Sequence, residues 1–322
     1  RKESSAASDV YKRQTICGCS FDGFAYNITK AYTTENAITD LYVNNIKSKN
    51  CRCVIHLSNC RANISNVIAI GTFKTNLLSN VFYVRSDVNA QFSNIEVSDY
   101  DGSVFHCNRY VGDTPTPEFS ASDPHKSFVN AVNVTATNTP RLVDLNSWCD
   151  IVLTNCVANY KSTNRASIEF RNGLGTIKIS NSSIYSILST GTNPLPSNER
   201  SIYVSNCNIT DSIYDDTITE AVTAFVINGN NIGNTILLRK SNAKVVNNVM
   251  VNEFTGVQVY TNGENIFVNN NIKEKTTPLV LLTQNSTGNK CIVTNNAVYS
   301  STVIQDMGTS NTVKENGNYS FG

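Results

Sequence analysis

Charged side chains are scarce in this sequence. Aspartate, glutamate, lysine and arginine make up 16% of its 322 residues, and the net charge is only +1. An ordinary soluble domain carries about a quarter of charged residues. Proteins that bind nucleic acid need a basic face that neutralises phosphates. The composition therefore argues against nucleic acid as a partner.

Long apolar runs and helical patterns are also missing. No apolar run reaches the roughly 18–20 residues that a membrane-spanning helix requires. No secretory signal is visible, and no stretch of useful length repeats its apolar residues with a period of 3.6. We therefore expect no membrane partner and no α-helical fold.

The ten cysteines lack the spacing of a zinc site. The closest pairs, Cys17–Cys19 and Cys51–Cys53, have one residue between them instead of the usual two. Cys60, Cys156 and Cys207 recur at one position of a repeated phrase, which favours buried free thiols over disulfides. We expect neither a metal nor another cofactor.

Asparagine is abundant, with 46 residues, and it recurs in a repeated six-residue phrase. The phrase reads apolar, small or polar, Asn (or Gly or Ala), a variable fourth position, any residue, apolar. Its ten copies are 57–62, 92–97, 129–134, 153–158, 179–184, 204–209, 227–232, 245–250, 267–272 and 293–298. A phrase that returns at such intervals indicates a stacked repeat fold.

The spacing of the phrase predicts the fold class. From the third copy onward the copies start 18 to 26 residues apart. Within each copy, apolar residues flank a polar corner, which is the pattern of strand, bend and strand. Asn suits the corner because it tolerates left-handed backbone and forms local hydrogen bonds. We predict an all-β chain, a right-handed parallel β-helix of about 10–12 coils, forming a single domain over residues 15–322.

The fourth position of the phrase is predicted to face inward. It is Asn230, Asn248, Asn270 and Asn296 in the last four copies, and a cysteine, serine or aliphatic residue earlier. Buried asparagine must be hydrogen-bonded, so these four side chains are expected to form a ladder from coil to coil.

A second strand precedes the phrase in most coils. Alternation of side chains places one set inside: Phe82, Val84, Phe105, Val143, Leu145, Ile168, Phe170, Val257 and Val259. The outward residues form two predicted columns. The first column is Tyr83, Val104, Asp144, Glu169, Leu237, Gln258 and Leu281. The second is Arg85, His106, Asn146, Arg171, Arg239, Tyr260 and Thr283.

The middle of this outward face is the candidate catalytic site. Asp144 and Glu169 occupy the same position of neighbouring coils, which predicts carboxyls about 5 Å apart, the separation found in retaining glycosidases. Like charges that close raise one pKa, as a general acid requires. His106 and Arg171 complete the candidate catalytic set. The alternative is that exposed strand residues are polar in any case and that Arg171 neutralises two acids.

Substrate-binding candidates surround these four residues. They are Tyr83, Arg85, Arg109, Tyr110, Asn146, Arg239 and Tyr260. Arg109 and Tyr110 belong to an insertion at about 108–126 that is rich in proline and is predicted to be a loop. Its aromatic, arginine and acidic side chains suit a sugar, and its alternative role is that of a neutral spacer. Two closer acid pairs, Asp99/Asp101 and Asp215/Asp216, are expected in turns.

The first residues are treated apart from the fold. Residues 4–14 resemble the translated sequencing-adapter tail at the ends of many environmental, assembly-derived proteins, with a disordered polar leader as the alternative. We therefore exclude residues 1–14 from the predicted fold, and we expect the native N-terminus to be missing.

With its coil phrase, the sequence over about 36–320 resembles the pectate-lyase-like superfamily of right-handed parallel β-helices. Its closing segment 308–319 is similar to the way many such chains end. The version it most resembles occurs in phage tailspikes, prophage tail proteins and related polysaccharide-acting proteins. It departs from the enzymes of that superfamily. The Trp-Ile-Asp-His phrase and the calcium-binding aspartates of pectate lyases are absent, and of the polygalacturonase phrases only an isolated Asp215-Asp216 is present.

Three functions stay open at this point. The first is a carbohydrate-binding tailspike or tail-fibre shaft, which the resemblance implies to be trimeric, with or without depolymerase activity. The second is a secreted polysaccharide lyase or glycoside hydrolase, and the third is a structural or adhesive rod. The resemblance implies a bacterial-surface or plant polysaccharide as partner, and a place on a virion tail or outside the cell.

Overall fold

The computed structural model describes residues 13–23, 26–29, 39–71, 79–85, 87–108, 110–111, 114–115, 126–163, 165–171, 175–191, 200–217, 223–239, 241–251, 253–261, 263–275 and 277–321. The chain divides into two compact units, residues 1–165 and 166–322, which we describe separately. The prediction of a single domain stays a prediction.

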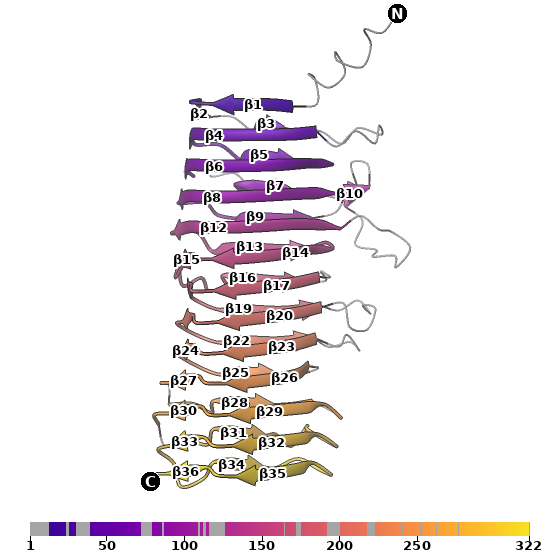
Figure 1. Ribbon diagram of the computed structural model, residues 1–322, viewed down its shortest axis with the longest axis vertical. Coiled ribbons are helices and arrows are strands. Elements are labelled where there is room, and N and C mark those ends of the chain that lie inside the picture. The colour runs from indigo at the N-terminus through magenta and orange to yellow at the C-terminus, as the bar shows by residue number, and fades with distance from the viewer. Residues whose placement is uncertain are drawn as a thin grey trace, which may run out of the picture. The chain divides into compact units, whose positions relative to one another are not determined.

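Unit 1 consists of parallel strands in two sheets (Figure 1). The first sheet contains β1 (Arg13–Cys17), β2 (Ser20–Asp22), β4 (Thr39–Lys49), β6 (Cys60–Ile70), β8 (Val88–Ser98), β12 (Ser127–Thr137), β14 (Cys149–Thr154) and β15 (Val157–Ala158). The second contains β3 (Tyr26–Thr29), β5 (Cys53–Leu57), β7 (Phe82–Val84), β9 (Ser103–Asn108) and β13 (Arg141–Asn146). Strand β1 begins within the predicted leader, at Arg13. Within the 108–126 insertion, β10 (Tyr110–Val111) pairs with β11 (Thr114–Pro115) in antiparallel fashion.

Unit 2 repeats the same plan with shorter strands. Its first-sheet strands are β17 (Gly175–Ser180), β18 (Ser183–Ile184), β20 (Arg200–Ser205), β21 (Asn208–Ile209), β23 (Thr223–Asn228), β24 (Asn231–Ile232), β26 (Ser241–Val246), β27 (Val249–Met250), β29 (Asn265–Asn269), β30 (Ile272–Lys273), β32 (Lys290–Thr294), β33 (Ala297–Val298), β35 (Thr312–Asn316) and β36 (Tyr319–Ser320). Its second-sheet strands are β16 (Ile168–Arg171), β19 (Ile187–Gly191), β22 (Ile213–Thr217), β25 (Ile236–Leu238), β28 (Val257–Val259), β31 (Val280–Leu282) and β34 (Ile304–Asp306).

This architecture confirms the predicted all-β parallel β-helix, a β-solenoid of about 10 turns. The described residues form strands and no helix. All nine side chains predicted to face inward on the second strand are completely buried. Each coil cannot bury its own apolar face, so stacking of coils builds a continuous core within each unit.

An asparagine at the corner of the first-sheet strands makes the bend. This residue has a positive φ in coil after coil: Asn45, Asn66, Asn94, Asn133, Asn155, Asn181, Asn206, Asn247, Asn270 and Asn295. The side chains also stack along the outside, as when Asn94 Nδ2 donates to Asn66 Oδ1 at 3.2 Å and Asn133 Nδ2 to Asn94 Oδ1 at 3.1 Å. Asn is favoured here because it tolerates left-handed backbone better than other residues with a side chain.

The buried asparagine ladder exists, with one residue corrected. It consists of Asn230, Asn248, Asn271, Asn296 and Asn318, and the backbone N–H of each donates to Oδ1 of the next at 2.9 Å. The prediction that Asn270 faces inward is wrong, because Asn270 is the exposed bend residue and Asn271 is 1% exposed. The run Asn269–Asn271 offers three candidates for one position, and apolar spacing alone chose the wrong one.

Two further copies of the phrase were placed in the wrong frame. Strand β12 pairs Ala131 with Leu153 and Val132 with Thr154, so the bend falls at Asn133 and not at residue 131. The copy predicted at 57–62 overlaps the start of β6, whose bend residue is Asn66. At 129–134 the shift is two residues, which a period of two leaves open.

The described cysteines are free, and eight of the ten are buried, as predicted for Cys60, Cys156 and Cys207. Cys156 and Cys207 follow the bend residue, whereas Cys60 begins β6 and pairs with Val88. Burial raises the pKa of Cys53 to about 12, so this thiol stays protonated and unreactive at neutral pH.

Unit 2 also encloses charges. Asp215 lies within β22 and is completely buried, so its predicted place in a turn is wrong. Arg200 Nη1 donates to Ser189 Oγ at 3.2 Å, and its guanidinium carbon lies 4.7 Å from the ring centroid of Phe170. Burial lowers the pKa of Arg200 to about 10, and the charge of Asp215 acts in the opposite direction.

Replacing Lys273 by methionine is expected to stabilise the protein by about 1–2 kcal/mol at neutral pH. Lys273 occupies an inward column between Met250 and Val298 and is 0% exposed. Burial lowers its pKa from 10.5 to about 8, so the folded state carries the cost of a buried charge fully below pH 8. The gain should shrink as pH rises from 8 to 10.5, and denaturant unfolding at several pH values measures it. A gain that is independent of pH would contradict this origin.

Candidate functional site

The outward face of the second sheet in unit 1 carries the predicted site residues. Register pairs His56 with Tyr83, Tyr83 with His106, and His106 with Asp144, so these four side chains form one column. The sequence analysis placed His106 in the column of Arg85, and that assignment is wrong by two residues. Strand β9 runs from Ser103 to Asn108, and the residue that pairs with Tyr83 is His106, two residues after the predicted Val104.

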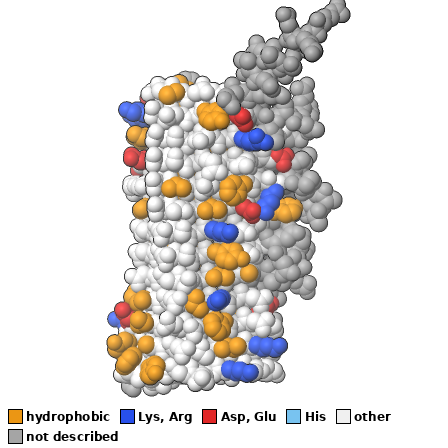
Figure 2. Space-filling model, viewed as in Figure 1, with side chains coloured by type: hydrophobic (Ala, Val, Ile, Leu, Met, Phe, Trp, Pro, Cys, Tyr) orange, Lys and Arg blue, Asp and Glu red, His pale blue; other side chains and the backbone are white. Residues whose placement is uncertain are grey.

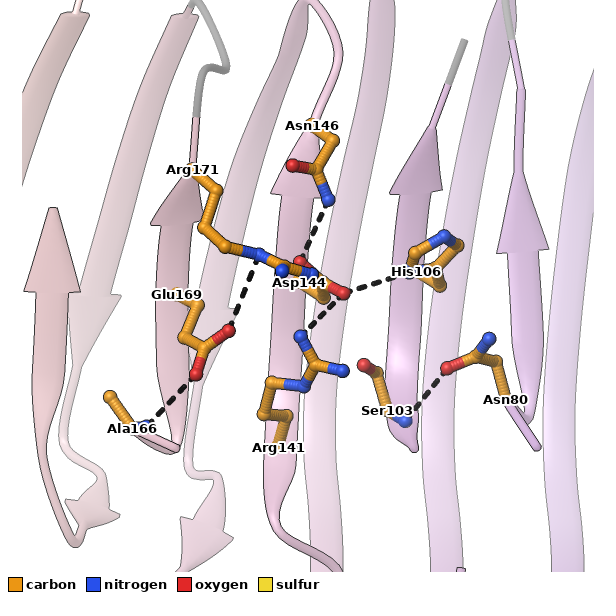
Figure 3. Close-up of polar contacts among 9 residues, drawn as sticks. All are labelled: Asn80, Ser103, His106, Arg141, Asp144, Asn146, Ala166, Glu169 and Arg171. Atoms are coloured by element: carbon orange, nitrogen blue, oxygen red, sulfur yellow. Dashed lines mark hydrogen bonds and ion pairs between the residues drawn. The ribbon is translucent and has the colours of Figure 1, made fainter. Parts of the chain in front are cut away.

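Asp144 lies at the centre of a polar network (Figure 3). Its Oδ2 accepts from Arg141 Nη1 at 2.6 Å and lies 3.1 Å from His106 Nδ1. Its Oδ1 accepts from Asn146 Nδ2 at 2.9 Å. Charge-assisted hydrogen bonds of this kind hold both the carboxylate and its partners in one geometry.

The network is more buried than predicted. Asp144 and Arg141 are 0% exposed and His106 is 9% exposed, although Asp144 alternates with the core residues Val143 and Leu145. The prediction of an open, solvent-facing carboxylate is therefore wrong. On the same face, Tyr83, Arg85 and Asn146 are only half-buried.

The imidazole of His106 has a defined orientation. When Nδ1–H donates to Asp144, the other ring nitrogen, Nε2, is the acceptor. A histidine held this way by a carboxylate can accept a proton at Nε2, which is the arrangement used in general acid–base catalysis. His106, between Tyr83 and Asp144 in the column, therefore offers a base beside an aromatic ring.

Aromatic rings line the column. The rings of Tyr83 and His106 meet edge to face at 4.6 Å between centroids, and those of His56 and Tyr83 at 5.5 Å. Burial lowers the pKa of His56 to about 4, and the positive charge of Arg85 acts in the same direction. His56 is thus neutral at physiological pH.

The depressed pKa of His56 predicts a pH dependence of stability. Because the unfolded imidazole binds a proton near pH 6.5 and the folded one only near pH 4, stability should fall as pH drops through this range, by up to about 3 kcal/mol. Comparing unfolding of the wild type with His56→Gln at neutral and acidic pH isolates this contribution. Equal acid sensitivity of the two proteins would contradict it.

The other half of the predicted catalytic set lies in unit 2. Glu169 Oε1 accepts from the backbone N–H of Ala166 at 3.1 Å, and Glu169 Oε2 lies 3.4 Å from Arg171 Nε (Figure 3). Glu169 is 5% exposed, so it too is more buried than predicted, whereas Arg171 is partly exposed. The predicted distance between Asp144 and Glu169 spans the two units and stays a prediction.

The substrate-binding candidates are dispersed. Tyr83, Arg85 and Asn146 are half-buried in unit 1. Arg239 and Tyr260 form a separate contact in unit 2, with 5.8 Å from the guanidinium carbon to the ring centroid. Arg109, the side chain of Tyr110 and the wall predicted from the loop at 108–126 lie outside the described residues.

Sequence reasoning missed Arg141. This residue begins β13, immediately after Thr139-Pro140, and its full burial requires the anionic partner that Asp144 supplies. A charged residue at the start of an apolar strand, three residues before an acid, is the signal that would have found it.

In the described part of the chain, no group of three or more His, Cys, Asp or Glu side chains is placed to hold a metal ion. Within the same residues, no helix has the length and hydropathy that crossing a membrane requires.

No protein-family model matches the chain, and no curated protein matches it significantly by sequence. Among solved structures it is similar to a surface adhesin of Streptococcus pneumoniae, with 11% identity, TM-score 0.42, and 87% of this chain and 85% of that one covered. It is also similar to the A-module of a mannuronan C-5 epimerase of Azotobacter vinelandii, with 10% identity, TM-score 0.40, and 88% and 91% covered. A third is tailspike protein 3 of bacteriophage CBA120, with 11% identity, TM-score 0.36, and 95% and 51% covered. No functional conclusion follows from likenesses of this degree.

Proposed function

We propose that this protein is a carbohydrate-binding parallel β-helix whose binding face is the outward side of the second sheet in unit 1. The observation that carries the proposal is the column in which Tyr83 and His106 meet edge to face above the fixed Asp144. Tyrosine and imidazole offer both a ring face and a polar tip, which is what a sugar, with its apolar ring faces and hydroxyl rim, requires.

The network beneath the rings supports binding over a purely structural role. Arg141 and Asn146 hold Asp144 from two sides, and Asp144 in turn holds His106, so little conformational freedom is left to lose when a ligand binds. A rod without a ligand would gain as much stability from apolar side chains at these positions, since buried ion pairs are seldom stabilising relative to apolar replacements.

Polysaccharide cleavage is the second candidate function, and the pairing of His106 with Asp144 favours it. In a lyase, His106 Nε2 would remove the proton next to the acidic group of a uronate, and the leaving sugar oxygen would depart as a carbon–carbon double bond forms. The proposed carbohydrate-binding protein lies on a virion tail or outside the cell, and it assembles as a homotrimer.

Binding to a panel of capsular and pectic polysaccharides tests the first function. We expect at least one to bind, and Tyr83→Ala to weaken binding about tenfold, because one lost stacking contact is worth on the order of 1 kcal/mol or more. Tyr42→Ala is the matched control, since Tyr42 lies on the first sheet of unit 1 and is 40% exposed. If no polysaccharide binds, or if both variants lose affinity equally, the proposed binding face is contradicted. A structural rod would then be the remaining function.

Product analysis in the same panel tests the second function. A rise in absorbance from unsaturated sugars would establish a lyase, and new reducing ends without that absorbance a hydrolase. His106→Gln should abolish either product while the chain still binds. If the wild type binds a polysaccharide but forms no product, the catalytic function is contradicted and the binding function is retained.

A further inference from the structure

The outward face of the first sheet in unit 2 carries a regular stripe of side chains. One residue from each coil lies in register with the next, and the order along the stripe is Lys178, Tyr203, Val226, Lys244, Phe267, Ile292 and Lys314. The sequence lysine, aromatic, aliphatic therefore occurs twice and closes on a third lysine. Figure 2 shows lysine and apolar side chains alternating in a line on this face.

The spacing of the stripe follows from the coil. Neighbouring strands lie about 4.8 Å apart, so lysines recur about every 14 Å, and so do the two aromatic rings. Tyr203 is 38% exposed and Ile292 39%, while Phe267 is half-buried. Lys178 Nζ lies 5.9 Å from the ring centroid of Tyr203, so cation and ring form one unit of the pattern.

Most of the side chains that flank the stripe carry a hydroxyl or an amide. The column on one side is Thr176, Ser201, Ala224, Asn242, Asn265, Lys290 and Thr312. The column on the other side is Ser180, Ser205, Asn228, Val246, Asn269, Thr294 and Asn316. These three columns contain four lysines and no acidic residue, so the face is positive although the whole chain carries only +1.

We propose that this stripe binds a linear anionic polysaccharide laid along the stacking direction. The rings of Tyr203 and Phe267 provide faces for sugar rings, the flanking amides and hydroxyls bond sugar hydroxyls, and the lysines neutralise acidic groups. Sparse lysines fit a polymer in which only some sugars are acidic.

Two other macromolecules fit this face less well. A nucleic acid carries a phosphate on every nucleotide and needs a denser cationic track than one lysine in about 14 Å. A protein interface has an apolar core largely free of charge, whereas here lysines interrupt the apolar residues at every third position. The proposal uses residues of unit 2 only, so it stands or falls independently of the Tyr83 and His106 face.

Four probes test the proposal: hyaluronate and polygalacturonate as acidic polysaccharides, dextran as a neutral one, and an oligothymidylate as a single-stranded nucleic acid. We expect an acidic polysaccharide to bind, dextran not to bind, and affinity to fall with added salt. Removing both rings, in Tyr203→Ala with Phe267→Ala, should weaken binding at least about tenfold. Replacing Lys178 and Lys244 by glutamine should weaken it and flatten the salt dependence.

Matched variants separate binding from folding. Tyr203→Phe keeps the ring and should retain affinity, and Tyr42→Ala removes an equally exposed tyrosine outside the stripe and should have no effect. Thermal unfolding of each variant should match the wild type. Failure of both acidic polysaccharides to bind, tighter binding of the oligothymidylate, or full affinity in the variant without both rings would each overturn the proposal.

Discussion

Replacing Asn248 by leucine is expected to lower the free energy of unfolding by about 4 kcal/mol. Asn248 is 1% exposed and sits in the middle of the buried ladder. Its Oδ1 accepts from the backbone N–H of Asn230 at 2.9 Å, and its Nδ2 donates to the carbonyl of Ile227 at 3.0 Å. Leucine has the same number and branching of side-chain heavy atoms, with bulkier methyl groups, so the change removes hydrogen bonds without opening a cavity.

The size of the effect comes from the groups left behind. A buried backbone donor and a buried backbone acceptor would lose their partners, and each such group costs about 1–3 kcal/mol. The side chains of Asn230 and Asn271 would lose a bond as well. The damage therefore extends to the coils on both sides.

Asn247→Gly is the control for this prediction. Asn247 precedes Asn248, is exposed, and has φ 57°, a conformation that glycine adopts without strain. We expect a change below about 1 kcal/mol in denaturant unfolding. Similar losses for the two variants would mean that asparagine content, and not the inward ladder, stabilises unit 2.

Asp144→Ala is expected to cost about 3–5 kcal/mol, the range found when one partner of a buried ion pair is removed. Arg141 is 0% exposed and donates to Asp144 at 2.6 Å, so its charge would lose the carboxylate that compensates it. His106 and Asn146 would lose the same acceptor.

Replacing both members of the pair distinguishes a lost charge pair from lost packing. Asp144→Leu combined with Arg141→Met should recover most of the stability lost in Asp144→Ala, because two apolar side chains carry no desolvation cost. Denaturant midpoints of the three proteins measure this. A double variant as unstable as Asp144→Ala would show that the network itself, with His106 and Asn146, is required for folding.

The sequence predicts the architecture well because the fold repeats. Ten copies of one phrase average out local ambiguity, and all nine residues assigned inward on the second strand are buried. Single coils are less secure, since a strand shifted by two residues keeps its apolar alternation. This explains why His106 aligns with Tyr83, whereas Asn270 was chosen over Asn271 because three asparagines follow one another there.

The candidate site was predictable only in part. Alternation placed Tyr83 and Asp144 in one outward column, but the burial of Asp144 does not follow from alternation. Nor does the pattern show that Arg141, at the start of its strand, bends its side chain toward Asp144. Such contacts depend on side-chain conformations, which strand periodicity does not specify.

The most direct test of the proposed binding face is the imidazole NMR spectrum of His106 during polysaccharide titration. The chain has only three histidines, and the signal lost in His106→Gln assigns this one. We predict that the His106 signal shifts saturably with a polysaccharide found to bind in the panel, and that Tyr83→Ala weakens this response. A His106 signal that stays unchanged while the polysaccharide binds would contradict the assignment of the site to this face.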